Sequence, residues 1–381
     1  MLNIHHALEK NGYESYVVWG RGRRPKNRHE ISIEDDLGIK LHGLYTRVTD
    51  RTGFASKRAT KRLLDILDNI KPDVIQLHNL HGYYLNIEML FHYIRKHNIK
   101  VFWTLHDCWS FTGHCAYFDA IGCDRWKNGC YDCPQKGTYP ASRIIDSSVW
   151  NWRKKKELFS GLNITLIVPC KWLSVLVKQS FLCEYPVEVI YNGIDTQKFK
   201  PRTSSFRKDN NLHEKIIILG VANEWTPRKG LGDFIKLEKI LSEKIADQYK
   251  IIVVGLDKYQ INKMPENILA IQRTASLDKL VEIYSAADVL FNPTYEDNFP
   301  TTNLEAICCG TPVVTYKTGG SPESVDKDTG FVIDQGDVQN MADIICNHKL
   351  RKIGKDINLS RVGKKFDKSQ MIQQYINLYT K

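Results

Sequence analysis

The sequence lacks the segments that would tie it to a membrane or to an export route. No apolar run approaches the roughly 20 residues that a membrane-spanning helix needs. The N-terminal residues MLNIHHALEKNGYE lack the apolar stretch of a secretory signal, and the chain has neither short internal repeats nor long low-complexity tracts. These absences predict a cytoplasmic globular protein, in which structural disulfides are rare.

The composition is that of an ordinary globular chain with an excess of positive charge. Its 381 residues suggest two domains, and 42% of them are hydrophobic and 25% charged. Fifty-four Lys and Arg against 43 Asp and Glu give a formal net charge of +11. That excess suits an anionic partner, such as a phosphorylated substrate, an acidic membrane surface or nucleic acid, although solvated surface charge gives the same count.

Short β-rich runs alternate with helical patterns along the whole chain, which predicts an α/β fold with parallel sheets covered on both faces. The strands are expected at 15–20, 73–78, 100–106, 164–169, 187–192, 215–222, 250–255, 268–272, 288–293, 312–317 and 330–333. The helices are expected at 2–11, 58–70, 86–98, 171–181, 230–245, 276–287 and 337–349.

A polar segment with several turn residues, 192–214, marks the boundary between two domains. We expect two doubly wound, Rossmann-like domains, 1–192 and 193–381, facing a cleft, with the last helix packing back on the first domain. A doubly wound domain normally opens with a central strand and a glycine-rich turn, whereas this chain opens with the helix at 2–11. The first strand of the N-terminal domain is therefore expected to be missing from this sequence, which mass spectrometry of the native N-terminus would test.

The most informative stretch is DVLFNPTYEDNFPTTNLEAICCGTPVVTYKTGGSPE at 288–323. It predicts a strand, a loop with Asp297, and a helix from about Thr302 with Glu305 in its first turn. Carboxylates at these places can accept hydrogen bonds from sugar diols, and a helix N-terminus attracts phosphate. The alternative interpretation of Glu305 is a capping box with Thr302, which needs no ligand.

The spacing Asp-x7-Glu, followed by AICCGTPVV and TGGSPE, resembles the donor signature of the retaining glycosyltransferases of family four, which have the GT-B fold. VIYNGID at 189–195 resembles the entry to the family's second domain, and ANEWTPRKGL at 222–231 resembles its phosphate-binding loop. The resemblance covers nearly the whole chain. The chain departs from the family at Asp297, usually Glu, and at Glu224, where many members have Arg.

The resemblance implies a donor site. Glu305 would hold the ribose, Asp297 the transferred sugar, and Arg228 and Lys229 the diphosphate, for which fixed cations are suited. His106, after the strand at 100–106, would reach the donor sugar or its phosphate, either as a neutral donor or as an imidazolium. The other nucleotide-sugar-binding residues are expected at the helix start, at a glycine turn and near the base: Thr301, Thr302, Asn303, Gly319, Gly320 and Arg273. The alternatives are a solvated cationic pair, a core histidine and an ordinary tight turn.

Five of the ten cysteines lie between Cys108 and Cys133. Within the loop 107–134, four cysteines spaced x7, x6 and x2 suggest a structural zinc site, with free thiols or disulfides as alternatives: Cys115, Cys123, Cys130 and Cys133. His114 is a substitute ligand. This loop also resembles sugar transferases of bacterial surface-polysaccharide pathways, of the colanic acid or O-antigen type.

These features predict a retaining, hexosyltransferase-type enzyme that moves a sugar from a UDP- or GDP-linked donor to a lipid-linked oligosaccharide in surface polysaccharide or lipopolysaccharide biosynthesis. No cofactor is expected to be required for catalysis, and no nucleic acid is expected as a partner. The basic, amphipathic stretch 149–162 suggests peripheral contact with an anionic membrane surface, although a solvated helix has the same pattern. An inactive relative, a GT-B epimerase or phosphorylase, and a basic nucleic-acid-binding protein are the alternatives.

Overall fold

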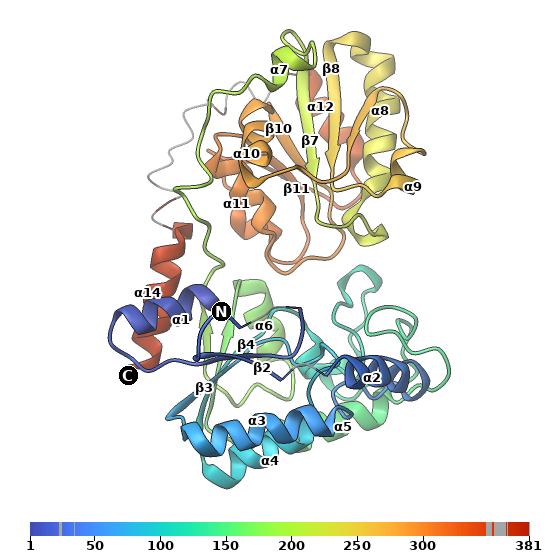
Figure 1. The fold of residues 1–381 in the computed structure, drawn as a ribbon. Helices are drawn as coiled ribbons and strands as arrows, with labels where there is room; N and C mark the ends of the chain where they lie inside the picture. The colour runs from blue at the N-terminus through green and yellow to red at the C-terminus, as the bar shows by residue number, and fades with distance from the viewer. Residues whose placement is uncertain (23–24, 34, 348–352, 354–362, 364, 381) are drawn as a thin grey trace. The chain divides into compact units, whose positions relative to one another are not determined.

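The computed structural model describes residues 1–22, 25–33, 35–347, 353, 363 and 365–380 (Figure 1). These residues form two compact units, which are described separately. The first unit comprises residues 1–190 and 372–381, and the second comprises residues 191–371. Both are α/β domains built on parallel sheets, as the alternating pattern of the sequence predicts.

The first unit contains a four-stranded parallel sheet in the order β3-β4-β5-β6 and a separate parallel pair, β1-β2. The strands are β1 (Val17–Trp19), β2 (Glu30–Ser32), β3 (Val74–Leu77), β4 (Lys100–Thr104), β5 (Ile164–Val168) and β6 (Val187–Val189). The helices are α1 (Leu2–Lys10), α2 (Asp36–Thr49), α3 (Lys57–Ile70), α4 (Ile87–His97), α5 (Ser148–Phe159), α6 (Lys171–Lys178) and the 3-10 turns η1 (Trp109–Phe111), η2 (Asp119–Ile121) and η3 (Arg125–Lys127). The expected additional strand stays a prediction.

Helices cover both faces of the first sheet. Phe102 and Trp103 are adjacent in β4, so their side chains point to opposite faces. The ring of Phe102 packs against Tyr379 of α14 (Lys368–Tyr379), with 5.2 Å between centroids. The ring of Trp103 contacts Phe91 of α4 and Phe159 of α5 on the other face. The last helix therefore packs on the sheet of the first unit.

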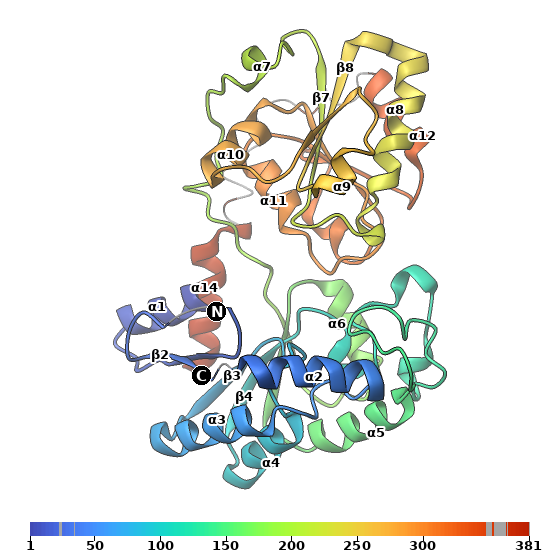
Figure 2. The same ribbon diagram turned by 45° about the vertical axis from the view of Figure 1, so that its right-hand side comes forward.

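The second unit holds a six-stranded parallel sheet in the order β12-β11-β10-β7-β8-β9 (Figure 2). The strands are β7 (Ile216–Val221), β8 (Tyr249–Val254), β9 (Ile268–Ile271), β10 (Val289–Asn292), β11 (Val313–Tyr316) and β12 (Gly330–Ile333). The helices are α7 (Phe206–Asp209), α8 (Leu231–Ile245), α9 (Lys258–Ile261), α10 (Leu277–Ala286), α11 (Thr301–Cys308), α12 (Val338–Cys346) and the 3-10 turns η4 (Pro227–Lys229), η5 (Ala246–Gln248) and η6 (Ser321–Ser324).

The strand order indicates the edge of this sheet at which a ligand is expected to bind. From β7 the chain winds outward through β8 and β9, then returns to pair β10 beside β7. This reversal is the topological switch point of a doubly wound sheet, and ligands of such sheets bind beyond the carboxyl ends of the strands there. The loops that follow β7 and β10 contain the predicted cationic and acidic residues.

The predicted strands and helices all correspond to elements of the structure, with ends shifted by a few residues. The sequence analysis did not locate β2, α2, α7 or α9. Residues 348–349, the end of the last predicted helix of the second domain, lie outside the described residues. Within the described part of the chain, no helix is both long and apolar enough to cross a membrane.

Candidate functional site

The loops after β7 and β10 are joined through the predicted charged residues. Nζ of Lys229 lies 2.5 Å from Oδ2 of Asp297, and 22% and 16% of these two side chains are exposed. Arg228 donates from Nη1 to the carbonyl oxygen of Glu296 over 2.8 Å, and its own carbonyl accepts from the N–H of Tyr295 over 2.7 Å. The cationic and acidic segments therefore meet at the switch point, and the ion pair stays partly open to solvent.

Two glycines permit the close approach of these loops. Gly230 has a φ of +73°, and a Cβ there would lie 2.1 Å from the carbonyl oxygen of Pro293. Gly319, after β11, has a φ of +51°, and a Cβ would lie 1.9 Å from the carbonyl oxygen of Asp297. A side chain at either position is excluded by sterics as well as by φ. Gly319 is thus more than part of a tight turn, because it brings a third loop against Asp297.

Glu305 lies in the first turns of α11 and is held by two hydroxyl groups. Tyr284, a buried residue of α10, donates to Oε2 over 2.9 Å, and Thr301 donates to Oε1 over 3.4 Å. Burial raises the pKa of Glu305 above its usual range, and these hydrogen bonds offset part of the rise. The alternative of a capping box with Thr302 is wrong: α11 has Pro300 as its N-cap, without a side-chain capping bond. Glu305 therefore does not serve as part of a cap for α11.

The Asn303 side chain is structural, which corrects its expected role at the donor. It is fully buried, accepts from Nδ2 of Asn292 over 2.8 Å and donates to Oγ of Ser324 over 2.9 Å. These bonds tie α11 to β10 and to η6. Thr301 and Thr302 lie at the helix start beside it, where N–H groups and the helix dipole favour an anion.

The remaining predicted donor residues lie on neighbouring loops of the same unit. Arg273, after β9, is exposed and donates from Nη2 to Oδ1 of Asn223 over 2.7 Å, which joins the loops after β9 and β7. Gly320 is the N-cap of η6 and follows Gly319 directly. The structure therefore gathers the predicted residues of this unit on loops that follow β7, β9, β10 and β11.

In the first unit, His106 follows β4, and His78 follows the neighbouring strand β3. Nδ1 of His78 lies 3.0 Å from Nε2 of His106, so one ring donates to the other. Burial lowers the pKa of His106, and it lowers that of His78 to about 3, with smaller contributions from His106 and the N-terminal amino group. Because its pKa is lowered, His106 is expected to be neutral at neutral pH. This favours the role of a neutral hydrogen-bonding group over that of an imidazolium.

A second histidine, His81, lies at the same edge of the sheet and has a buried acidic partner. Nε2 of His81 lies 2.8 Å from Oδ2 of Asp107, and Nδ1 lies 3.1 Å from the hydroxyl of Tyr139. Oδ1 of Asp107 accepts from the N–H of Trp109 over 2.9 Å. This chain of contacts fixes the start of the cysteine-rich loop beside His106. This pairing could not be predicted from the sequence, because its members are far apart along the chain.

The four cysteines predicted to bind zinc line one small hollow of the loop, together with Trp126 and Tyr131. Among the described residues, the one group of three or more candidate ligand atoms within 4.8 Å of one another is His5, His6 and Glu9. In the loop, the Cys115 and Cys133 thiols share a hydrogen bond that lowers the pKa of Cys133 to about 7 and raises that of Cys115. The structural zinc site stays a prediction, which metal analysis of the purified protein would test directly.

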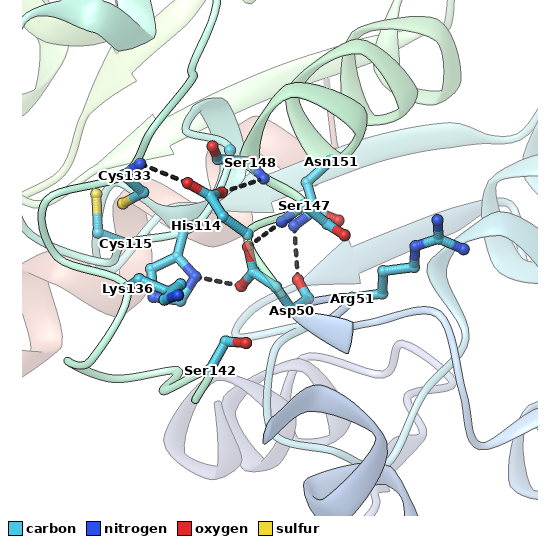
Figure 3. Close-up of polar contacts among 12 residues, drawn as sticks. Asp50, Arg51, His114, Cys115, Cys133, Lys136, Ser142, Ser147, Ser148 and Asn151 are labelled. Atoms are coloured by element: carbon cyan, nitrogen blue, oxygen red, sulfur yellow. Dashed lines mark hydrogen bonds and ion pairs between the residues drawn. The ribbon is translucent and has the colours of Figure 1, made fainter. Parts of the chain in front are cut away.

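Buried polar contacts tie the cysteine-rich loop to α2 and to the start of α5 (Figure 3). Asp50, fully buried at the end of α2, accepts from the N–H of Ser147 over 2.9 Å and forms a very short contact with Nδ1 of His114. Burial lowers the pKa of His114, but Asp50 outweighs that effect and raises it overall. Nε2 of His114 lies 3.4 Å from the carbonyl oxygen of Thr138, and Asp50 links the ring to the start of α5 through Ser147.

Residues 149–159 of the stretch 149–162 lie in α5, and several of its apolar side chains pack inside the first unit. Trp152, Leu158 and Phe159 are buried, so they are not available to enter a lipid surface. Lys155 is buried with them, where its Nζ donates to the carbonyls of Trp109 and Thr112 over 2.7 and 3.1 Å. Val149 and Trp150 of the same helix are 40% and 36% exposed, and contact of this stretch with a membrane stays a prediction.

Comparison with known proteins defines the class. The model of "Glycosyl transferases group 1" matches residues 202–349, and the model of "Glycosyltransferase Family 4" matches residues 1–198. The protein is thus a glycosyltransferase of the GT-B type. Because the second match covers more than half of its length, the chain belongs to Glycosyltransferase Family 4.

A curated relative and two solved structures are similar over nearly the whole chain. The colanic acid biosynthesis glycosyl transferase WcaC of Escherichia coli is 24% identical, over 99% of this chain and 95% of the relative. Sucrose-phosphate synthase of Thermosynechococcus elongatus superposes with a TM-score of 0.72 at 15% identity, covering 99% of this chain and 91% of that one. Anabaena HepE in complex with UDP-glucose superposes with a TM-score of 0.62 at 15% identity, covering 95% and 98%. At these identities the solved structures support the fold alone.

Proposed function

We propose that this enzyme transfers a sugar from a UDP- or GDP-linked donor to a hydroxyl group of a lipid-linked saccharide, with retention of the anomeric configuration. The observation that carries the proposal is the meeting of Lys229 and Asp297 at the switch point of the second unit. The solved relative with UDP-glucose supports a nucleotide sugar as donor. The relative named for colanic acid biosynthesis supports a role in surface polysaccharide synthesis.

The charged residues divide the donor between them. Glu305, oriented by Tyr284, accepts hydrogen bonds from the ribose hydroxyls, and Asp297 accepts them from the transferred sugar. Lys229 and Arg228 neutralise the diphosphate, together with the N–H groups at the start of α11. Asp297 holds the Lys229 ammonium in place before the donor arrives, so less side-chain freedom is lost on binding.

The reaction breaks the bond between the anomeric carbon and the diphosphate oxygen, and the electron pair leaves with the nucleoside diphosphate. The acceptor oxygen forms the new bond on the same face of the sugar, and its proton passes to the departing diphosphate. Positive charge fixed at Arg228 and Lys229 stabilises the negative charge that develops on the leaving group. In the first unit, burial lowers the pKa of His106, so its imidazole is available as a neutral hydrogen-bonding group.

Thermal unfolding in the presence of UDP-, GDP- and ADP-sugars tests the donor assignment, because a ligand that binds the native state raises its stability. One UDP- or GDP-sugar is expected to raise the unfolding temperature of the wild type and not that of Lys229→Ala. Mass spectrometry of a lipid-linked saccharide incubated with that sugar should then show one added residue and free nucleoside diphosphate. Absence of protection by every nucleotide sugar would overturn the proposal.

A further inference from the structure

Helix α2 carries a row of apolar side chains that face solvent. Leu37, Leu41, Leu44 and Val48 are between 36% and 66% exposed. At about 100° of rotation per residue, these four side chains fall within an arc of about 60° on the helix. The row is therefore one continuous stripe, and α2 lies at the surface of the first unit in both views (Figures 1 and 2).

The opposite side of α2 is the side that packs against the protein, and it is polar or small. His42, Gly43 and Thr46 are buried there. Nδ1 of His42 lies 2.8 Å from Oγ of Ser56, and its Nε2 accepts from the N–H of Gly53 over 3.0 Å. A surface helix of a globular protein normally turns its apolar side inward. This helix does the reverse, and its inward orientation is fixed by hydrogen bonds.

A second segment extends the stripe at the C-terminal end of α2. The N–H of Arg143 donates to the carbonyl of Arg47 over 2.8 Å, and the N–H of Ile145 donates to that of Val48 over 3.1 Å. Ile144 and Ile145 are 66% and 47% exposed. The apolar surface, here called the α2 stripe, consists of Leu37, Leu41, Leu44, Val48, Ile144 and Ile145. Contiguous exposed apolar surface of this kind marks an interaction site.

Three exposed cations lie along and beside the α2 stripe. Lys40, Arg47 and Arg143 are exposed, and their side chains form no hydrogen bond or ion pair with the part of the chain that the structure describes. Of the three nearby acids, Asp35 and Asp36 lie at the helix start, where Asp35 accepts from the N–H of Gly38, and Asp146 is occupied by two backbone N–H groups. Apolar side chains flanked by unpaired cations suit the boundary of an anionic bilayer, where lysine and arginine reach the headgroups.

We infer that the α2 stripe is the surface with which the enzyme docks on an anionic lipid bilayer. The inference rests on the proposed function in one respect, because a lipid-linked acceptor is presented at a bilayer. It places the contact on α2 and residues 143–145 instead of on the face of α5 that holds Trp152, Leu158 and Phe159, which is buried. Leucine and isoleucine side chains enter the acyl boundary while Lys40, Arg47 and Arg143 pair with lipid phosphates.

Co-sedimentation of the full chain with vesicles tests the docking surface. The wild type is expected to bind vesicles of phosphatidylcholine mixed with phosphatidylglycerol and to bind phosphatidylcholine vesicles at least about tenfold more weakly. Leu41→Ser with Leu44→Ser should lower binding to the mixed vesicles by at least about tenfold, because two anchoring side chains are lost. Lys40→Gln with Arg47→Gln should also lower binding to the mixed vesicles. Added salt should weaken vesicle binding by the wild type more than vesicle binding by this variant.

The matched control is Val175→Ser on α6, which removes an apolar side chain that is 53% exposed in the same unit. It should bind vesicles like the wild type. Equal binding by the stripe variant and the wild type, or no binding by the wild type, would overturn the inference. So would a wild-type dimer in solution that the stripe variant dissociates, because the stripe would then cover a second copy. A nucleotide sugar should still raise the unfolding temperature of the stripe variant. Loss of vesicle binding can therefore be distinguished from a wrong donor assignment.

Discussion

Lys229 and Asp297 form an ion pair across 68 residues of sequence, with 2.5 Å between Nζ and Oδ2. The pair joins the 3-10 turn after β7 to the loop after β10, the two strands that flank the switch point of the second sheet. Each residue limits where the other can lie, so a single contact positions both a cation for a diphosphate and a carboxylate for a sugar.

Lys229→Ala is expected to lower sugar transfer at least tenfold, equivalent to about 1.4 kcal/mol in the barrier, because a cation at the leaving group is lost. The matched control is Lys244→Ala on α8, which breaks an ion pair with Asp343 over 2.9 Å in the same unit. The control should retain wild-type turnover. Initial rates at saturating donor and acceptor decide, and equal rates for the two variants would contradict the assignment of Lys229.

Tyr284→Phe tests whether Glu305 is oriented for the ribose. The change removes the 2.9 Å hydrogen bond to Oε2 and leaves that oxygen without its buried donor. We expect weaker nucleotide binding together with a loss of about 1–3 kcal/mol in the free energy of unfolding. Tyr249→Phe, which removes a 3.0 Å bond to the Glu238 carbonyl, should cost stability without changing affinity. Calorimetric titration with the nucleotide separates the two effects, and similar affinities in both variants would count against a role for Tyr284.

Gly319→Ala tests the close approach between the loop after β11 and Asp297. Its Cβ would lie 1.9 Å from the Asp297 carbonyl oxygen, at a φ of +51°, so the loop has to move. We expect donor affinity to fall sharply, with some loss of stability. Gly232→Ala on α8, where a Cβ meets nothing within 4 Å, should be neutral or slightly stabilising. Thermal unfolding with and without the nucleotide sugar measures both, and full protection of Gly319→Ala would show that the loop has no part in binding.

Lys155→Met tests the buried lysine of α5 through the pH dependence of stability. Burial lowers the pKa of Lys155 to about 7, although neighbouring Cys130 and Asp50 act in the opposite direction. Between this value and the usual lysine pKa, the unfolded chain binds more protons than the folded chain, so the contribution of Lys155 to stability rises with pH. Urea unfolding at pH 7 and pH 9.5 should show the wild type gaining stability relative to Lys155→Met. Lys156→Met, on the exposed side of the helix, is the control, and a constant difference for Lys155→Met would contradict the depressed pKa.

The fold was largely predictable because its strands are buried on both faces. Runs such as IIILGV of β7 and YKIIVV of β8 are almost wholly apolar and are separated by helix-length segments. That pattern is specific for a parallel sheet. Helix α2 was not predicted, although its leucines have helical spacing. That spacing could not show that the leucines face solvent and that a histidine, a glycine and a threonine pack on the protein. Sequence spacing alone does not say which side of a helix is buried.

The candidate site was predictable to the level of loops. Residues that follow neighbouring parallel strands must lie at one edge of the sheet, and this is why Lys229 and Asp297 meet. The partners within the site were not predictable, because Tyr284 reaches Glu305 from another helix and Asn303 turns inward to Asn292. The type of a polar residue at a helix start does not show whether it binds a ligand or makes hydrogen bonds in the core.

The most direct test of the account is calorimetric titration of UDP and of GDP into the wild type, Glu305→Ala and Lys229→Ala. We expect one of the two nucleotides to bind the wild type and both substitutions to weaken its binding at least about tenfold, since each removes a group that touches the ligand. Wild-type affinity in both variants, or no binding of either nucleotide to the wild type, would contradict the placement of the donor between Lys229, Asp297 and Glu305.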